Sequence, residues 1–336
     1  MYSFLAQHIY KAKGNHYMLG LESAMDDRVS YGKETAGKSD HSERLLGRYG
    51  SGTGGSTLFI TADALDNENR AVTAVRKVLR TLTKMKIPFK GQLIGLAGNT
   101  GSYKKDLLGE FNGSISTDIT PASQDEYLGY NRAEEFVELI EEFEKVPATS
   151  EVYYFDLKTS SNTQYPYLCH SRNPNCRAFA SSFPFYKVMG LDTYITDHLG
   201  FYLHAKNYTC STLKVGMHPK YSAEQIHEAA IWWALVQIGC LQDEDVPHFL
   251  QHKEVLDGCL ADEGKRAFEV AFKYSIKEDE YFRMIPGYQN FQKIQAGEVL
   301  ATSDGASVTS HWDGRIFMPL YHTQSNDGFF VLKEIE

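Results

Sequence analysis

The chain has 336 residues, of which 42% are hydrophobic, 13% aromatic and 23% charged, as is typical of a globular protein that buries a sizeable core. Its length predicts about two domains. The formal net charge of −9 argues against binding to nucleic acid or to anionic membranes, because both partners are themselves negative.

The first half of the chain predicts strands that alternate with helices. Residues 1–55 are polar and become Gly-rich toward their end, so we expect short edge strands and loops there. Residues 56–62 form a β-rich run, and the apolar residues of 72–82 are spaced for one face of a helix. A second buried strand is predicted at 91–98, and an amphipathic helix with solvent-facing glutamates at 131–146.

The pattern continues in the middle of the chain. Strands are predicted at 152–158, 185–191 and 211–216, and Ser222 is expected to cap a long helix that runs to about residue 239. Strands alternating with helices predict a largely parallel α/β sheet with helices on both faces.

The sequence pattern changes from about residue 267, where short predicted strands alternate with Gly-containing turns. This pattern predicts a small β domain, so we expect two domains, at 1–265 and 266–336. A biotinyl or lipoyl carrier domain would need a lysine at a hairpin tip, and the turn at 303–307 has none. We therefore expect the small domain to flank the site or to form a contact in a homo-oligomer.

Cysteine usage and targeting signals narrow the class further. The five cysteines are irregularly spaced and form no CxxC pair, which argues against a disulfide scaffold and a thiolate zinc site. Twelve histidines leave a histidine metal site open. The first residues lack a signal-peptide pattern, and the apolar stretch 229–241 is shorter than the roughly 20 residues of a membrane-spanning helix. We expect a cytoplasmic protein without a membrane partner.

Ligands of open α/β sheets bind beyond the carboxyl ends of the strands. In this chain those ends fall at 63–68, 99–103, 156–161 and 214–218. Taken alone, the carboxylates that follow the first strand are more typical of helix capping than of a ligand site.

A series of segments from residue 44 to the end nevertheless has a familiar order. The segments are 44–50 (RLLGRYG), 57–68, 91–98, Asn131-Arg132, 155–159 (FDLKT), 212–218, 228–235 (EAAIWWAL) and 282–291. Together they resemble the succinylglutamate desuccinylase/aspartoacylase family. The resemblance implies a zinc-carboxypeptidase-like α/β fold, a mixed sheet flanked by helices, with a small C-terminal all-β domain. It also implies hydrolysis of the amide of an N-acylated acidic amino acid.

The family holds one zinc ion through a His and a Glu of a His-Gly-Asn-Glu motif and the His of an Asp-Leu-His-Thr motif. The glutamate of a Thr-x-Glu-x-Gly strand is the general base. Two imidazoles and a carboxylate leave one zinc position open for water, and the nearby glutamate takes the proton of that water.

This chain departs from each of these motifs. Leu65 stands at the first ligand position, Glu68 is retained, Lys158 stands at the third ligand position and Lys214 at the general-base position. The surrounding residues hold the register: Asn67, Asp156, Leu157, Thr159, Thr212 and Gly216. Leucine has no lone pair and a lysine ammonium has no acceptor. We therefore expect no metal and no other cofactor, and the loss of zinc-dependent amide hydrolysis.

The substitutions also reverse the charge of the inferred pocket. It loses a dication and a carboxylate and gains the ammonium groups of Lys158 and Lys214, which favours an anionic small molecule as ligand. An ion pair between Lys158 and Glu68 with a purely structural role is an equal alternative.

The substrate-gripping residues are better preserved. Asn131 and Arg132 match an Asn-Arg pair of the family, in which the arginine is expected to hold a carboxylate bidentately. Arg172 lies in a segment that resembles the one carrying the second arginine of the family, and Arg177 competes for that role.

Two other functions stay open. A relocated metal would give an active hydrolase of N-acyl amino acids or related amides or esters, and an inert pocket would give a scaffold or interaction protein. Four carboxylates could form an all-oxygen site suited to magnesium or manganese: Asp63, Asp66, Glu68 and Asp156. His170 and His218 also lie near strand ends, and His218 matches a family histidine that we expect to be structural or at the pocket rim.

Overall fold

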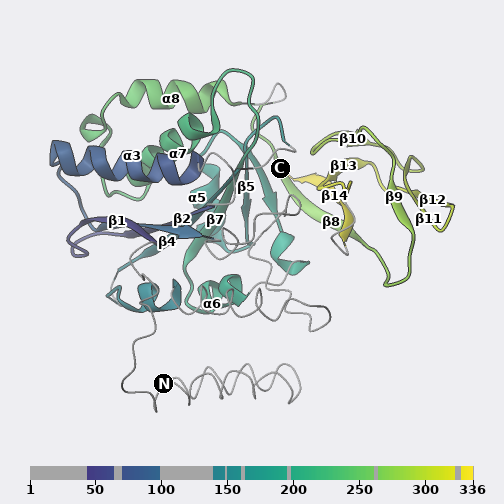
Figure 1. The fold of residues 1–336 in the computed structure, drawn as a ribbon, viewed down its shortest axis with the longest axis horizontal. Coiled ribbons are helices and arrows are strands. Elements are labelled where there is room, and N and C mark those ends of the chain that lie inside the picture. Colours follow the sequence, from purple (N-terminus) through teal and green to yellow (C-terminus); the bar gives the residue numbers. More distant parts are fainter. Residues whose placement is uncertain are drawn as a thin grey trace, which may run out of the picture. The chain divides into compact units, whose positions relative to one another are not determined.

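The structure of the chain is a computed structural model (Figure 1). The residues that it describes are 44–63, 70–98, 139–147, 150–159, 163–194, 198–260, 264–321 and 327–335. All of them belong to one compact unit, Ser42–Glu336. No helix in these stretches is long and apolar enough to cross a membrane.

Within the described residues, an 11-stranded sheet has the order β1-β3-β2-β4-β7-β5-β6-β8-β14-β13-β10. Its strands are β1 (Leu45–Gly50), β2 (Thr57–Asp63), β3 (Gln92–Gly98), β4 (Val152–Thr159), β5 (Tyr167–His170), β6 (Tyr186–Met189), β7 (Thr209–Val215), β8 (Ala267–Ser275), β10 (Lys293–Ile294), β13 (Gly314–Phe317) and β14 (Asp327–Ile335). The sheet is mixed, as the resemblance implies. The alternation of elements alone had predicted a largely parallel sheet.

The parallel part of the sheet lies at its centre. Strands β3, β2, β4 and β7 run parallel to one another, and their carboxyl ends therefore meet at one edge. Strand β5 joins β7 in the antiparallel direction and then pairs in parallel with β6. Strand β1 and the strands after β8 add antiparallel pairs at the two ends. A four-residue strand such as β5 has too little periodicity to be recognised in the sequence.

Helices cover both faces of the central strands (Figure 1). Helices α3 (Arg70–Met85), α7 (Ala223–Gln237) and α8 (Phe249–Gly258) lie on one face, and they bury a large aliphatic core that includes Leu58, Val75 and Leu213. The opposite face packs a smaller aromatic cluster around Phe143 and Tyr154, under the helical residues 139–144 and α6 (His198–Ala205). Helix α5 (Pro174–Ser181) follows β5.

The predicted start of α7 is confirmed. The Ser222 hydroxyl accepts a hydrogen bond from the backbone N–H of Gln225, and the Gln225 side chain accepts one from the backbone N–H of Ser222. This reciprocal capping box satisfies two donors that a helix start otherwise leaves unpaired.

The described residues after 266 are all in strands and turns. A separate 3-stranded sheet has the order β12-β11-β9, formed by β9 (Phe282–Met284), β11 (Val299–Ser303) and β12 (Ala306–Thr309). Strand β8, however, pairs with β6, and Tyr167 of β5 packs edge-on against Phe291 and Phe317. The pairing of β6 with β8 thus crosses the expected domain boundary at 265/266. The division into two domains at this boundary stays a prediction.

Candidate functional site

The candidate site is built around two charged side chains at the carboxyl end of β4. Side chains alternate along a strand, so Asp156 and Lys158 point to the same face of the sheet. Each is only 7% exposed, and Lys158 Nζ lies 3.3 Å from Asp156 Oδ2. A buried ammonium is costly without a counter-charge, and Asp156 supplies one.

Hydroxyl groups from the two neighbouring strands hold the Asp156 carboxylate. Thr61 of β2 donates to Oδ1 at 2.8 Å, and Thr212 of β7 donates to Oδ2 at 3.5 Å. Because the Thr61 proton is used in this way, the Tyr154 hydroxyl donates to Thr61 Oγ1, at 2.8 Å. The register explains the convergence, since Thr61 and Thr212 are the cross-strand partners of Asp156.

Lys214 brings a second ammonium to the same face. It is the cross-strand partner of Lys158 in the parallel ladder of β4 and β7, and neighbouring strands lie about 4.8 Å apart. Lys214 is half-buried. The structure therefore places Lys158 and Lys214 side by side on neighbouring strands. That they occupy the third zinc-ligand position and the general-base position of the family stays a prediction.

Asp156, Lys158 and Lys214 are called the lysine cluster below. Cys169 lies beside it, and nothing in the sequence pattern marks this cysteine as a site residue. It lies on β5 opposite Thr212. Burial raises the pKa of the Cys169 thiol to about 11, while the charges of Lys214 and Lys158 act in the opposite direction. The thiol is thus protonated at neutral pH beside two ammonium groups. The sequence does not predict the position of Cys169, because neither β5 nor the pairing of β5 with β7 can be recognised in it.

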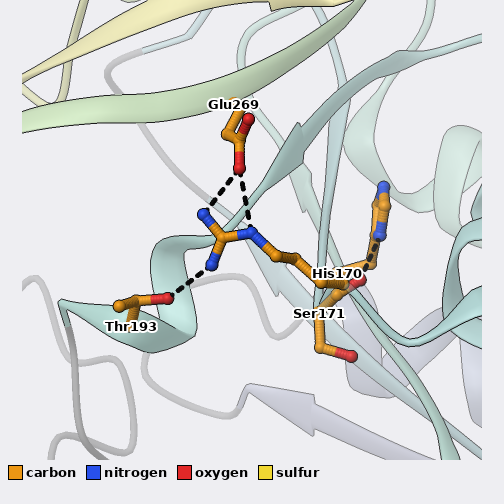
Figure 2. A network of polar contacts seen from close by, with 5 residues as sticks. His170, Ser171, Thr193 and Glu269 are labelled. Atoms are coloured by element: carbon orange, nitrogen blue, oxygen red, sulfur yellow. Dashed lines mark hydrogen bonds and ion pairs between the residues drawn. The ribbon is translucent and has the colours of Figure 1, made fainter.

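Arg172 lies in the loop after β5, whereas Lys214 pairs with Tyr167 at the other end of that strand. The Nε and Nη2 of Arg172 donate to Glu269 Oε1 at 2.9 and 2.6 Å, and its Nη1 donates to Thr193 Oγ1 at 2.8 Å (Figure 2). The hydrogen bonds to Glu269 are the main cause that raises the pKa of Arg172. These contacts join the loop to β8 and to the 3-10 turn η2 (Leu191–Thr193). The role of Arg172, or of Arg177, as a substrate ligand stays a prediction.

The two histidines near strand ends have local backbone partners. His170 Nδ1 lies 2.8 Å from the Ser171 carbonyl oxygen, and burial lowers the pKa of His170 (Figure 2). His218 Nδ1 accepts hydrogen bonds from the backbone N–H groups of Lys220 and Tyr221, and its ring stacks on Tyr221. Burial also lowers the pKa of His218. The hydrogen bonds that His218 accepts from Lys220 and Tyr221 hold the turn between β7 and α7.

The other predicted site residues lie outside what the structure describes. These are Leu65, Asp66, Glu68, Asn131, Arg132 and the side chain of Asp63, so the alternative pair of Lys158 with Glu68 stays a prediction. Lys158 itself does not fit zinc, because an ammonium paired with a carboxylate has no lone pair to donate. In the described stretches, no three His, Cys, Asp or Glu side chains are grouped so as to hold a metal ion.

Comparison with solved structures identifies the fold. Succinylglutamate desuccinylase from Vibrio parahaemolyticus matches with a TM-score of 0.61 at 12% identity, over 86% of this chain and 84% of that one. A succinylglutamate desuccinylase/aspartoacylase from Rhodobacter sphaeroides matches with a TM-score of 0.55 at 16% identity, over 84% and 86%. The ectoine utilization protein EutE (DoeB) from Ruegeria pomeroyi matches with a TM-score of 0.52 at 14% identity, over 84% and 86%.

These matches define a class of fold, and they confirm the one that the sequence predicts. The chain has the mixed α/β fold of the succinylglutamate desuccinylase/aspartoacylase structures. No protein-family profile matches the sequence, and no curated protein sequence matches it.

Proposed function

We propose that this protein is a relative of the desuccinylase/aspartoacylase enzymes that has lost zinc-dependent amide hydrolysis and binds an acidic small molecule in the former active site. The observation that carries the proposal is the buried contact of Lys158 with Asp156, 3.3 Å apart. The resemblance aligns Lys158 with a zinc-ligating histidine of the family. The shared fold supports the alignment of that position.

The charges of the site favour an anion. Two ammonium groups, those of Lys158 and Lys214, lie on adjacent strand ends. A carboxylate or phosphate placed beside Lys214 would accept charge-assisted hydrogen bonds, which are stronger than neutral ones. The Asn131-Arg132 pair is proposed to grip the second acidic group of such a ligand.

Ligand binding tests this proposal directly. Purified protein is titrated with N-acetyl-aspartate, N-succinyl-glutamate, citrate and phosphate, by thermal shift and by calorimetry. At least one anion should raise the unfolding midpoint, and Lys214→Gln should weaken its binding by about tenfold, or about 1.4 kcal/mol. The control Lys84→Gln replaces an exposed lysine of α3 and should leave the affinity unchanged.

Two other outcomes would overturn the proposal in favour of the alternative functions. No response to any anion favours a scaffold with an inert pocket. Turnover of an N-acyl amino acid or ester that is lost on Glu68→Gln favours an active hydrolase. Metal analysis of protein purified with zinc available separates these cases further, because one zinc ion per chain would contradict the loss of the metal site.

A further inference from the structure

Two cysteines away from the lysine cluster stand close together where α5 meets the start of β7. Cys176 lies in the first turn of α5 and is 1% exposed, whereas Cys210 is half-buried. The backbone N–H of Cys210 donates to Cys176 Sγ at 3.1 Å. Both thiols also reach the carbonyl oxygen of Tyr208, from Cys210 Sγ at 3.4 Å and from Cys176 Sγ at 3.9 Å. The two sulfur atoms therefore converge on one acceptor.

The backbone geometry is compatible with a bond between these sulfurs. Disulfide-linked residues usually have Cα atoms about 4.4–6.8 Å apart. With ordinary bond lengths, the contact between Cys176 Sγ and the Cys210 nitrogen limits the distance between the two Cα atoms to about 7 Å. A second contact fixes the same segments, because Asn173 Nδ2 donates to Asn207 Oδ1 at 3.1 Å. Rotation of the two side chains is then the main movement that a disulfide requires.

The other three cysteines are poorly suited to thiol exchange. Burial raises the pKa of Cys169 to about 11 and the pKa values of Cys240 and Cys259 to about 12. Their thiolate fractions at neutral pH are therefore very small, and the thiolate is the reacting species.

We infer that Cys176 and Cys210 form a reversible dithiol–disulfide pair that exchanges with small-molecule disulfides. The half-buried Cys210 thiolate attacks one sulfur of the small disulfide, and one thiolate leaves. Cys176 then loses its proton to solvent and attacks Cys210 Sγ, which expels the second thiolate. Two electrons pass from the protein to the small molecule, which is reduced to two thiols.

The bond would join α5 covalently to β7, the strand that carries Thr212 and Lys214. It would close the chain between residues 176 and 210, and closing such a loop lowers the entropy of the unfolded state. The oxidised protein should thus unfold at a temperature several degrees higher than the reduced protein. This inference does not depend on the proposed ligand.

Peptide mapping tests the pair in the full-length protein. Trypsin cuts after lysine and arginine, so the five cysteines fall on separate peptides, at 159–172, 173–177, 207–214, 221–253 and 254–265. After incubation of the folded protein with oxidised glutathione, mass spectrometry should find 173–177 linked to 207–214. Treatment with dithiothreitol should release both peptides and lower the unfolding midpoint again.

Variants separate a specific pair from random oxidation. Cys210→Ser and Cys176→Ser should each abolish the linked peptide, while Cys259→Ser should retain it. Should Cys176→Ser fail to fold because of its burial, Cys210→Ser and the wild type still decide the matter. A stable glutathione adduct on wild-type Cys210 without the linked peptide would overturn the inference. So would linkage among the other cysteines at comparable yield.

Discussion

At the residue scale, His227 of α7 is a basic side chain in the apolar interior. It is 0% exposed, and neither ring nitrogen has a hydrogen-bond partner among the described residues. Burial lowers the pKa of His227 to about 3. The ring is therefore neutral in the folded protein throughout the physiological range.

This histidine should make the protein sensitive to mild acid. His227 binds a proton near pH 6.5 in the unfolded chain but only near pH 3 in the folded chain. Its contribution to stability is therefore complete above pH 6.5 and is lost as the pH falls toward 3. Between pH 7 and pH 5 the loss is about 2 kcal/mol. In His227→Leu the fall in unfolding free energy, measured by urea titration, should be smaller by that amount. The exposed control His311→Leu should leave the pH dependence as in the wild type.

The proposed alignment of Leu65, Glu68, Lys158 and Lys214 with the zinc site of the family makes a second prediction at this scale. In the proposed alignment, Leu65→His and Lys158→His would supply the two zinc-ligating imidazoles of the family, Glu68 the ligating carboxylate, and Lys214→Glu the general base. Together they should give one bound zinc ion per chain by elemental analysis, because two imidazoles and a carboxylate suffice for a catalytic zinc site. Leu65→His with Lys214→Glu alone, which keeps the Lys158 ammonium, is the matched control and should bind none. If the triple variant binds no metal, the motifs are misaligned.

At the element scale, the start of α7 depends on Ser222. Ser222→Ala removes the acceptor for the Gln225 N–H, and loss of such a cap costs about 1 kcal/mol. Urea denaturation should show this decrease. Ser307→Ala, at an exposed position of β12, should change the unfolding free energy by less than about 0.5 kcal/mol. An equal loss in both variants would mean that the cap contributes nothing specific.

The strands and helices that the sequence predicts are those with a clear period. The runs at 56–62, 91–98 and 152–158 match β2, β3 and β4 closely, because buried strands are apolar and are bounded by polar or Gly-containing turns. Helix α5 was missed, although Asn173 followed by Pro174 is a recognisable helix start and Asn173 does cap it.

The sequence predicts contacts within one strand but not contacts between distant segments. The contact of Lys158 with Asp156 is of the first kind, because the residues are two apart on one strand and the strand period places both side chains on one face. The pair of Arg172 with Glu269 depends instead on the pairing of β6 with β8. Nothing in the local pattern of either residue indicates that pairing, so the sequence does not predict this ion pair.

At the scale of the whole molecule, the ion pair of Arg172 with Glu269 joins the loop after β5 to β8, and Gly190 leaves room for the Arg172 side chain. Gly190 has φ +84°, and a Cβ there would lie 2.9 Å from Arg172 Nη2. Gly190→Ala should therefore cost about 1 kcal/mol of backbone strain and about 0.5–1 kcal/mol more for moving the half-exposed ion pair with Glu269.

A matched glycine isolates the second contribution. Gly297 has φ +86° and nothing within 4 Å of its would-be Cβ, so Gly297→Ala should show the backbone cost alone. In an Arg172→Ala background, the extra cost of Gly190→Ala should disappear, as a double-mutant cycle of unfolding free energies would reveal. Persistence of that extra cost would show that Arg172 is not its cause.

The position of β7 between β4 and β5 has a consequence for how Lys158 and Lys214 would recognise the proposed ligand. Backbone amides in the middle of a wide ladder exchange with deuterium only when the protein opens globally. Lys214 and Lys158 are thus mounted on paired strands that fluctuate little, and a ligand there would order few additional degrees of freedom. Such a site discriminates by fixed spacing between charges, so it should favour one length of diacid over its shorter and longer homologues.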